Sequence, residues 1–110
     1  MTVAEIAQRL GLAVAAGGAG LGRVVSGGHA GDLPSEALAQ ARAGQVWLTI
    51  QGHETVVAVA VHKRLAAVIL AGGRRPEPEA AARAEAEGLP ILTSGQGVFE
   101  LAGRLRELGL

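Results

Sequence analysis

The sequence of 110 residues contains no cysteine, no tyrosine, one tryptophan and one phenylalanine. Without cysteine the chain cannot form disulfides, ligate an iron–sulfur cluster through thiolates or use a thiol nucleophile. The shortage of aromatic side chains argues against single-stranded nucleic acid as a partner, because proteins that bind it stack the bases on aromatic rings. The core must therefore be built from aliphatic and small residues.

An excess of charge of one sign is also missing, since ten Lys and Arg residues balance ten Asp and Glu residues. Proteins that wrap DNA or bind membrane surfaces attract these partners through excess positive charge, so we expect neither nucleic acid nor a membrane as partner. A near-neutral surface also leaves copies of the chain free to associate. No signal segment opens the sequence, and the longest apolar stretch, 56–70, is interrupted by charged residues, so we expect a cytoplasmic protein.

The length fits one domain over residues 1–110. Residues 2–11 predict a helix, because Thr2 and Glu5 have capping-box spacing and Gly11 stands where a left-handed C-cap belongs. Such a helix could begin a helix-turn-helix, but the segment AVAAGGAGLGR that follows contains no recognition helix. The same segment lacks the third glycine of a dinucleotide-binding motif, whose place is taken by Arg23.

The rest of the pattern predicts an α/β fold. We expect a short strand around Val24 and Val25, a glycine-rich turn, and a helix that starts at Pro34 and ends before Gly44. Strands and helices then alternate over residues 46–50, 54–64, 67–71, 76–87, 90–94 and 96–109. Segment 54–64 is rich in valine, but we expect a buried helix there because it connects two strands that should be parallel. The prediction is a small single domain with a mainly parallel β-sheet flanked by helices.

Four loops would follow the carboxyl ends of these strands, and in a parallel sheet such loops share the edge at which ligands usually bind. The candidate ligand-binding residues on these loops are His29, Asp32, Gln51, His53, Gly72, Gly73, Arg74, Thr93 and Ser94. Imidazoles, guanidinium groups and helix N-termini could together hold a small anion or a phosphoryl group. The alternative is that each loop uses glycine and capping residues only because turns require them.

Arg74 and Arg75 are the unusual part of these loops. Both precede a predicted helix N-terminus, where positive charge is unfavourable for the helix. Glu77 and Glu79 follow closely and would neutralise them, which is the simplest explanation.

No catalytic or metal-binding pattern stands out. The chain has no P-loop motif and no G-x-S-x-G elbow, and His29, His53 and His62 lack the spacing of metal ligands. We therefore expect no catalytic residue, no metal and no cofactor.

In order along the chain, the segments GLGRVVSGG, GQVWLTIQGHE, AAVILAGGRRPEPE and GLPILTSGQGVFELAGRL resemble a DRTGG domain in its short stand-alone form. The most specific part runs from Val68 to Leu92. DRTGG domains are similar in fold to the N-terminal domain of HPr kinase/phosphorylase. They occur in phosphate acetyltransferases and CBS-domain inorganic pyrophosphatases, where they look like regulatory and dimerising modules. Stand-alone copies often lie near genes for iron-only hydrogenases.

The sequence departs from the family pattern at the residues that give the family its name. His53-Glu54 stands at the place of the Asp-Arg pair, and Ala71-Gly72-Gly73 stands at the place of Thr-Gly-Gly. The short stand-alone members look similar in having TIQ-x-H in this region. The resemblance therefore implies that Gln51 and His53 are the counterpart of the Asp-Arg pair.

These features favour a non-catalytic regulatory module that homodimerises and senses a small anionic or nucleotide ligand at the carboxyl edge of the sheet. Two other classes stay open. One is an interaction subunit that docks on a larger protein partner, for example in hydrogenase maturation or regulation. The other is a phosphoryl-transfer enzyme subunit that uses His29 or His53 as base or nucleophile, without a carboxylate cluster for Mg²⁺.

Overall fold

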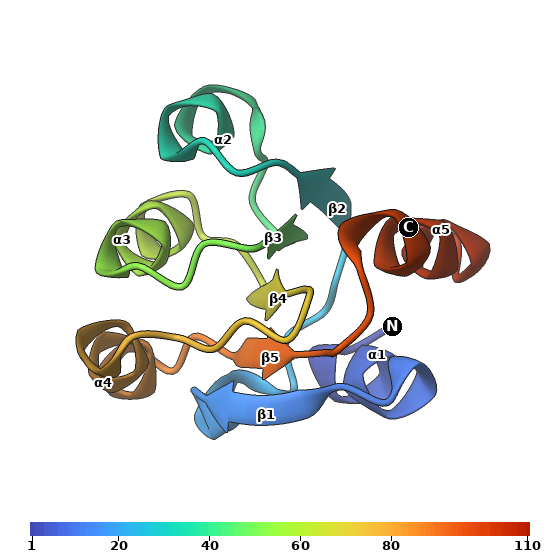
Figure 1. The fold of residues 1–110 in the computed structure, drawn as a ribbon, viewed down its shortest axis with the longest axis horizontal. Coiled ribbons are helices and arrows are strands. Elements are labelled where there is room, and N and C mark those ends of the chain that lie inside the picture. Colours follow the sequence, from blue (N-terminus) through green and yellow to red (C-terminus); the bar gives the residue numbers. More distant parts are fainter.

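The computed structural model describes all residues, 1–110. Figure 1 shows a sheet with helices on both sides. The helices are α1 (Val3–Leu10), α2 (Pro34–Gln40), α3 (Glu54–His62), α4 (Pro78–Glu87), α5 (Val98–Glu107) and the short 3₁₀ helix η1 (Gly18–Gly20). The strands are β1 (Ala13–Ala16), β2 (Gly27–Ala30), β3 (Gln45–Thr49), β4 (Ala67–Leu70) and β5 (Ile91–Thr93).

The five strands form one sheet in the order β1-β5-β4-β3-β2. Strands β2, β3, β4 and β5 run parallel to one another, and β1 alone pairs in the antiparallel direction with β5. The expected α/β fold with a mainly parallel sheet flanked by helices is therefore confirmed. Strands β1 and β2 are the two edges of the sheet.

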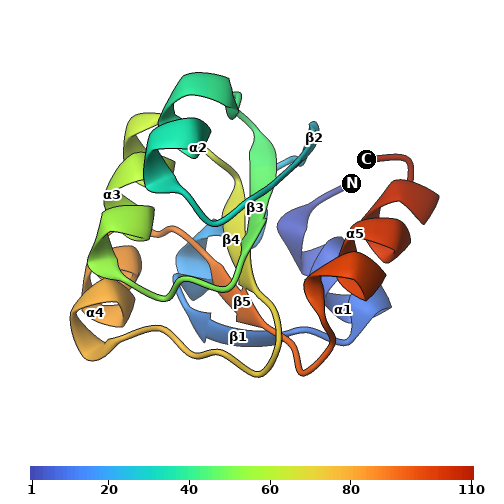
Figure 2. The same cartoon turned by 45° about the horizontal axis from the view of Figure 1, so that its top comes forward.

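The helices form two layers, with α2, α3 and α4 on one face of the sheet and α1 and α5 on the other (Figure 2). Successive side chains of a strand point to opposite faces, so each central strand contributes to two hydrophobic clusters. In β3, Val46 and Leu48 pack in the cluster of α1 and α5, whereas Trp47 packs in the cluster of α2, α3 and α4. No helix has the length and apolar character needed to cross a membrane.

The first helix forms as its capping pattern predicts. The Thr2 hydroxyl accepts a hydrogen bond from the Glu5 backbone N–H at 3.2 Å, and the Glu5 carboxylate accepts one from the Thr2 backbone N–H at 3.1 Å. Gly11 ends the helix in the left-handed region with φ 66°. The buried side chains of the helix form one stripe, which packs on the sheet.

The valine-rich segment after β3 is helical, as the connection between two parallel strands requires. It forms α3, in which Val56, Val57 and Val59 are buried against the sheet and the neighbouring helices. The helix ends at His62, two residues earlier than expected, and Arg64 follows with φ 57°.

The prediction of a strand around Val24 and Val25 is wrong. Val24 is 69% exposed and forms only an isolated bridge with Thr2. The strand lies at Gly27–Ala30, where pairing with β3 holds a sequence whose glycines resemble a turn. His29 is therefore a strand residue rather than a turn residue. The prediction also missed β1, and α2 stops at Gln40, earlier than expected.

Candidate ligand-binding site at the carboxyl edge of the sheet

The loop after β2 is attached to the end of β3 by Asp32. Its Oδ1 atom accepts a hydrogen bond from the Thr49 hydroxyl at 2.9 Å and another from the Ile50 backbone N–H at 3.1 Å. Thr49 is fully buried, so this carboxylate satisfies a buried hydroxyl that would otherwise lose its hydrogen bonds to water. Asp32 therefore fixes the position at which the β3 loop leaves the sheet.

The loop after β3 lies against the loop after β4. The Glu77 backbone N–H donates to Gly52 O at 2.9 Å, and a Cβ atom on Gly52 would lie 2.4 Å from Arg75 O. Only glycine permits this close approach. His53 next to it is the N-cap of α3, because its Nδ1 atom accepts the Thr55 backbone N–H at 3.1 Å.

The loop after β4 is joined in turn to the loop after β5. Gly72 donates its backbone N–H to Gln96 O at 2.7 Å, and Gly73 donates to Ser94 O at 2.9 Å. Both glycines have left-handed backbones, with φ 68° and 73°, which other residues adopt only with strain. The two N–H groups are occupied by these bonds, so the glycines shape the loop rather than bind an anion through their amides.

A pocket of about 330 Å³ opens where the β4 and β5 loops meet the turn between α1 and β1. Its lining residues are small, hydroxyl-bearing or cationic, and they are Gly11, Ala13, Gly73, Arg74, Arg75, Thr93, Ser94 and Gly95. We call it the arginine pocket. Thr93 and Ser94 are half-buried, and both arginines are exposed. The Ser94 hydroxyl accepts the Gln96 backbone N–H at 3.0 Å, which fixes the oxygen in place.

The electrostatics of the arginine pocket favour an anion. Its lining contains two guanidinium groups and no carboxylate. The molecule has two ion pairs, His29–Glu36 and Arg83–Glu54, so neither Glu77 nor Glu79 pairs with the two arginines. Guanidinium groups that lack a carboxylate partner can bind a phosphate or carboxylate through two parallel hydrogen bonds.

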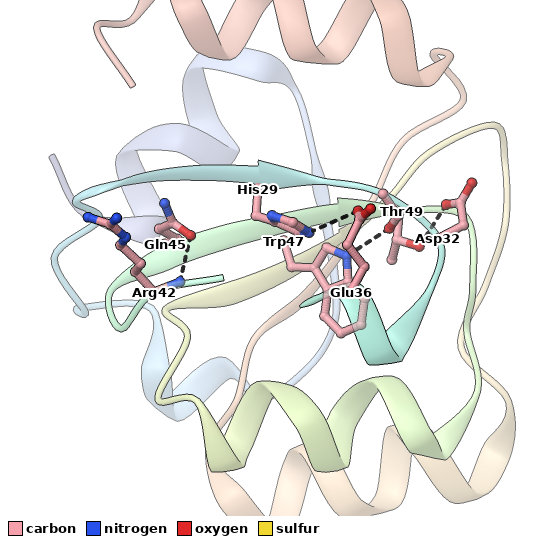
Figure 3. A network of polar contacts seen from close by, with 8 residues as sticks. His29, Asp32, Glu36, Arg42, Gln45, Trp47 and Thr49 are labelled. Carbon is pink, nitrogen blue, oxygen red and sulfur yellow. Dashed lines mark hydrogen bonds and ion pairs between the residues drawn. The ribbon is translucent and has the colours of Figure 1, made fainter. Parts of the chain in front are cut away.

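His29 lies apart from the arginine pocket, on the face of the sheet covered by α2 (Figure 3). Its ring meets the Trp47 ring edge to face, with centroids 6.5 Å apart, and its Nε2 atom lies 3.9 Å from the Glu36 carboxylate. That Nε2 atom is buried and has no hydrogen-bond partner. The Trp47 indole N–H donates to Gly31 O at 2.8 Å, so this group also holds the β2 end in place.

The candidate residues are thus divided among four places. Gly73, Arg74, Thr93 and Ser94 line the arginine pocket together. Gln51 and His53 line a separate cavity of about 10 Å³ under the β3 loop, which is the size of one water molecule. Gly72 shapes the β4 loop, His29 lies within β2, and Asp32 lies in the loop that follows β2.

Four lining residues of the arginine pocket were missing from the candidate residues. Gly11, Ala13 and Gly95 have no side-chain functional group. Gly11 precedes β1 and Ala13 begins it, and sequence patterns did not reveal this strand. Arg75 could have been included, because its positive charge before a predicted helix N-terminus was already unusual in the sequence. No group of three or more His, Asp and Glu side chains lies together as a metal site.

Comparisons with known proteins agree with this architecture. Residues 5–108 match the family model of the DRTGG domain. A similar solved structure contains the CBS and DRTGG domains of the regulatory region of Clostridium perfringens pyrophosphatase, complexed with the activator diadenosine tetraphosphate. It has a TM-score of 0.69 and 14% sequence identity, and the match covers 94% of this chain and 45% of that chain. The chain thus spans less than half of that chain's length, and this likeness concerns the fold.

A search of curated proteins found no match. The family match covers almost the whole sequence, and a structure that contains this domain has a similar fold. The chain belongs to the DRTGG domain family.

Proposed function

We propose that the protein is a non-catalytic regulatory module of the cytoplasm that homodimerises and binds a small anionic or nucleotide ligand in the arginine pocket. The observation that carries the ligand-binding part is the pair Arg74 and Arg75, which line a pocket without any carboxylate to neutralise them. Two hydroxyls, from Thr93 and Ser94, lie in the same lining and can donate to phosphate oxygens.

The backbone of the pocket supports the same ligand class. Gly95 and Arg75 each have a backbone N–H that donates to no backbone carbonyl of the chain. Backbone N–H groups in a glycine-rich loop are common partners of phosphate. The related regulatory region of Clostridium perfringens pyrophosphatase binds diadenosine tetraphosphate, which makes nucleotides the first compounds to test.

The chemistry of the pocket favours binding rather than phosphoryl transfer. Its lining has no histidine and no carboxylate that could act as a general base or hold Mg²⁺. His29 and His53 both lie outside it, and the Nδ1 atom of His53 is engaged in capping α3. A non-catalytic sensor needs only the cations and hydroxyls that are present.

Ligand binding is tested by thermal unfolding with phosphate, pyrophosphate, AMP, ATP and diadenosine tetraphosphate. A bound ligand at about 100 times its dissociation constant adds about 2.7 kcal/mol to the free energy of unfolding, so the melting temperature should rise. The double variant Arg74→Gln/Arg75→Gln should lose this rise. Arg83→Gln, which removes an arginine of α4 that pairs with Glu54 at 3.7 Å, is the control and should keep it.

Two results would reject the arginine pocket as the ligand site. One is that none of these compounds raises the melting temperature of the wild-type protein. The other is that the double variant responds as strongly as the wild-type protein.

Phe99 supports a second candidate function, that of an interaction subunit. This side chain, the one phenylalanine of the chain, is 92% exposed on α5. Exposed aromatic residues often become buried in protein interfaces. If the protein docks on a larger partner through α5, Phe99→Ser should abolish co-purification with that partner and leave ligand responses unchanged.

A further inference from the structure

Strand β2 forms an open edge of the sheet. It pairs with β3 on one side and with nothing on the other. The opposite edge, β1, contains a register irregularity between Val14 and Ala16, the kind of bulge that discourages pairing with another chain. β2 has the sequence GGHA, without the proline, lysine or bulge that usually protects an edge.

The direction of the free backbone groups follows from the pairing with β3. The Gly31 N–H donates to Leu48 O, so the backbone groups of Gly31 and His29 face β3. Because these groups alternate along a strand, the N–H and C=O of Gly28 and Ala30 face away from the sheet. Both residues are exposed, and neither has a side chain large enough to block another strand.

The two ends of β2 carry opposite charges. Figure 3 places Arg42 and Gln45 near one end of the strand and Asp32 near the other. Arg106 of α5 lines a pocket of about 330 Å³ with Gly27 and Gln45, at the same end as Arg42. Glu36, in the first turn of α2, lies at the same end as Asp32, because a Cβ atom on Gly31 would lie 2.9 Å from its carboxylate. One end of the edge is therefore basic and the other is acidic.

We infer that β2 pairs with β2 of a second copy of this chain, antiparallel and about a two-fold axis near His29, to form one continuous sheet across the dimer. In this arrangement Gly28 of each copy exchanges hydrogen bonds with Ala30 of the other, about four bonds in all. The basic end of each strand then lies beside the acidic end of its partner. This inference rests on the homodimer of the proposed function and names its surface.

A four-residue strand is too small to hold a dimer by itself, since stable interfaces bury well over 1,000 Å². The helices beside β2 supply further surface. Helix α2 lies beside β2 on one face of the sheet (Figure 1). Its N-cap residue Leu33 and its residue Leu38 are 64% and 46% exposed. On the other face the pocket between β2 and α5 offers Ala102 and Leu110, which are both half-buried. A two-fold axis brings each of these surfaces next to the same surface of the second copy.

The test is sedimentation equilibrium of the ligand-free protein. The wild-type protein should dimerise, and Ala30→Pro should weaken dimerisation about tenfold to a hundredfold, because it removes one outward N–H from each copy. The N–H of Ala30 faces away from β3, so the variant keeps the pairing of β2 with β3. Far-ultraviolet circular dichroism checks that the variant still folds.

A charge exchange tests the same surface without proline. Arg42→Glu and Glu36→Arg should each weaken the dimer at least about fivefold, and the double variant should recover most of the loss. Glu87→Arg, at the end of α4, makes the same change of charge as Glu36→Arg away from β2 and should leave the dimer unchanged.

The experiments distinguish a failure of the proposed dimer from a failure of the β2 surface. A wild-type protein that stays monomeric at high micromolar concentration overturns both the dimer and its surface, but leaves ligand binding in the arginine pocket standing. A dimer whose dissociation constant is unchanged in Ala30→Pro and in Arg42→Glu overturns the β2 surface alone.

Discussion

At the scale of single residues, close packing requires two of the four glycines in the segment 17–22, Gly17 and Gly20. A Cβ atom on Gly20 would lie 2.1 Å from Gly88 O, and one on Gly17 would lie 1.9 Å from Leu89 O. The segment passes so close to the backbone before β5 that no side chain fits at these two positions. The Gly17 N–H also donates to the Glu85 carboxylate at 2.8 Å, which holds the segment to α4.

We predict that Gly20→Ala lowers the free energy of unfolding by about 1–3 kcal/mol, because the methyl group forces two backbone segments apart. Gly18→Ala is the matched control: a Cβ atom there meets nothing within 4 Å, so its stability should be close to that of the wild-type protein. Urea denaturation measures both. Equal stability of the two variants would contradict this packing role.

Arg64 is the one residue other than glycine with a positive φ, 57°. The left-handed conformation costs an ordinary residue about 1–2 kcal/mol, part of which glycine avoids. Glycine also has more conformational entropy in the unfolded chain, which offsets part of this gain. We therefore predict that Arg64→Gly raises the free energy of unfolding by only about 0.5–1 kcal/mol. Lys63→Gly should lower it instead, because Lys63 has a right-handed backbone with φ −83°. Thermal unfolding distinguishes the two; a loss of stability in both variants would refute the argument.

At the scale of elements, the capping box of α1 links stability to pH. Hydrogen bonds from the backbone N–H and the hydroxyl of Thr2 hold the pKa of the Glu5 carboxyl below its ordinary value of 4.5. A carboxyl whose pKa is lowered on folding stabilises the native state above its unfolded pKa, and the effect is lost as the pH falls through its folded pKa. The cap is therefore intact at neutral pH and weakens below about pH 4.5.

We predict that Glu5→Gln lowers the melting temperature at pH 7 and that the difference from the wild-type protein shrinks steadily from pH 4.5 to lower pH. Glu79→Gln is the control, since Glu79 lies in the first turn of α4 and its N-cap has no side-chain hydrogen bond. Melting temperatures recorded across this range give the answer. A difference that stays constant with pH would show that the carboxylate charge has no part in the cap.

The elements that sequence patterns predicted are those with long periodic or uniformly apolar segments. The helix at α1 followed from its capping pair, and α3 followed from the need to connect β3 and β4, although its valines favour a strand. Strands β1 and β2 have the sequences AVAA and GGHA, in which pairing partners rather than side chains decide the structure. Such strands cannot be recognised from local propensity.

The same distinction applies to the arginine pocket. Gly73, Arg74, Thr93 and Ser94 lie at or just after the carboxyl ends of strands that the sequence predicted, so the topology of a parallel sheet was enough to place them on one edge. Gly11 and Ala13 complete the pocket from a turn into an unpredicted strand. His29 was assigned to a loop, but its strand turns the imidazole toward Trp47.

At the scale of the whole molecule, the two hydrophobic clusters are coupled through the sheet. One joins α1 and α5 to the strands, and the other joins α2, α3 and α4 to the opposite face of the same strands. In β4, Val68 and Leu70 belong to one cluster while Ala67 and Ile69 belong to the other. If either helical layer detached from the sheet, one apolar face of every central strand would become exposed to water. We therefore expect residues 1–110 to unfold as one domain.

Trp47 offers a test of this coupling, because the single tryptophan lies fully buried in the cluster of α2, α3 and α4. Leu101 of α5 is also fully buried, but in the other cluster, so Leu101→Ala removes packing only from the face that Trp47 does not touch. We predict that this variant loses about 2–5 kcal/mol of stability and that urea transitions followed by Trp47 fluorescence and by circular dichroism shift together. If the layers unfolded independently, the fluorescence midpoint would stay where it is in the wild-type protein while the circular dichroism transition split in two. The shared strands make the joint shift the expected result, since a cavity under α5 weakens the same sheet on which Trp47 is packed.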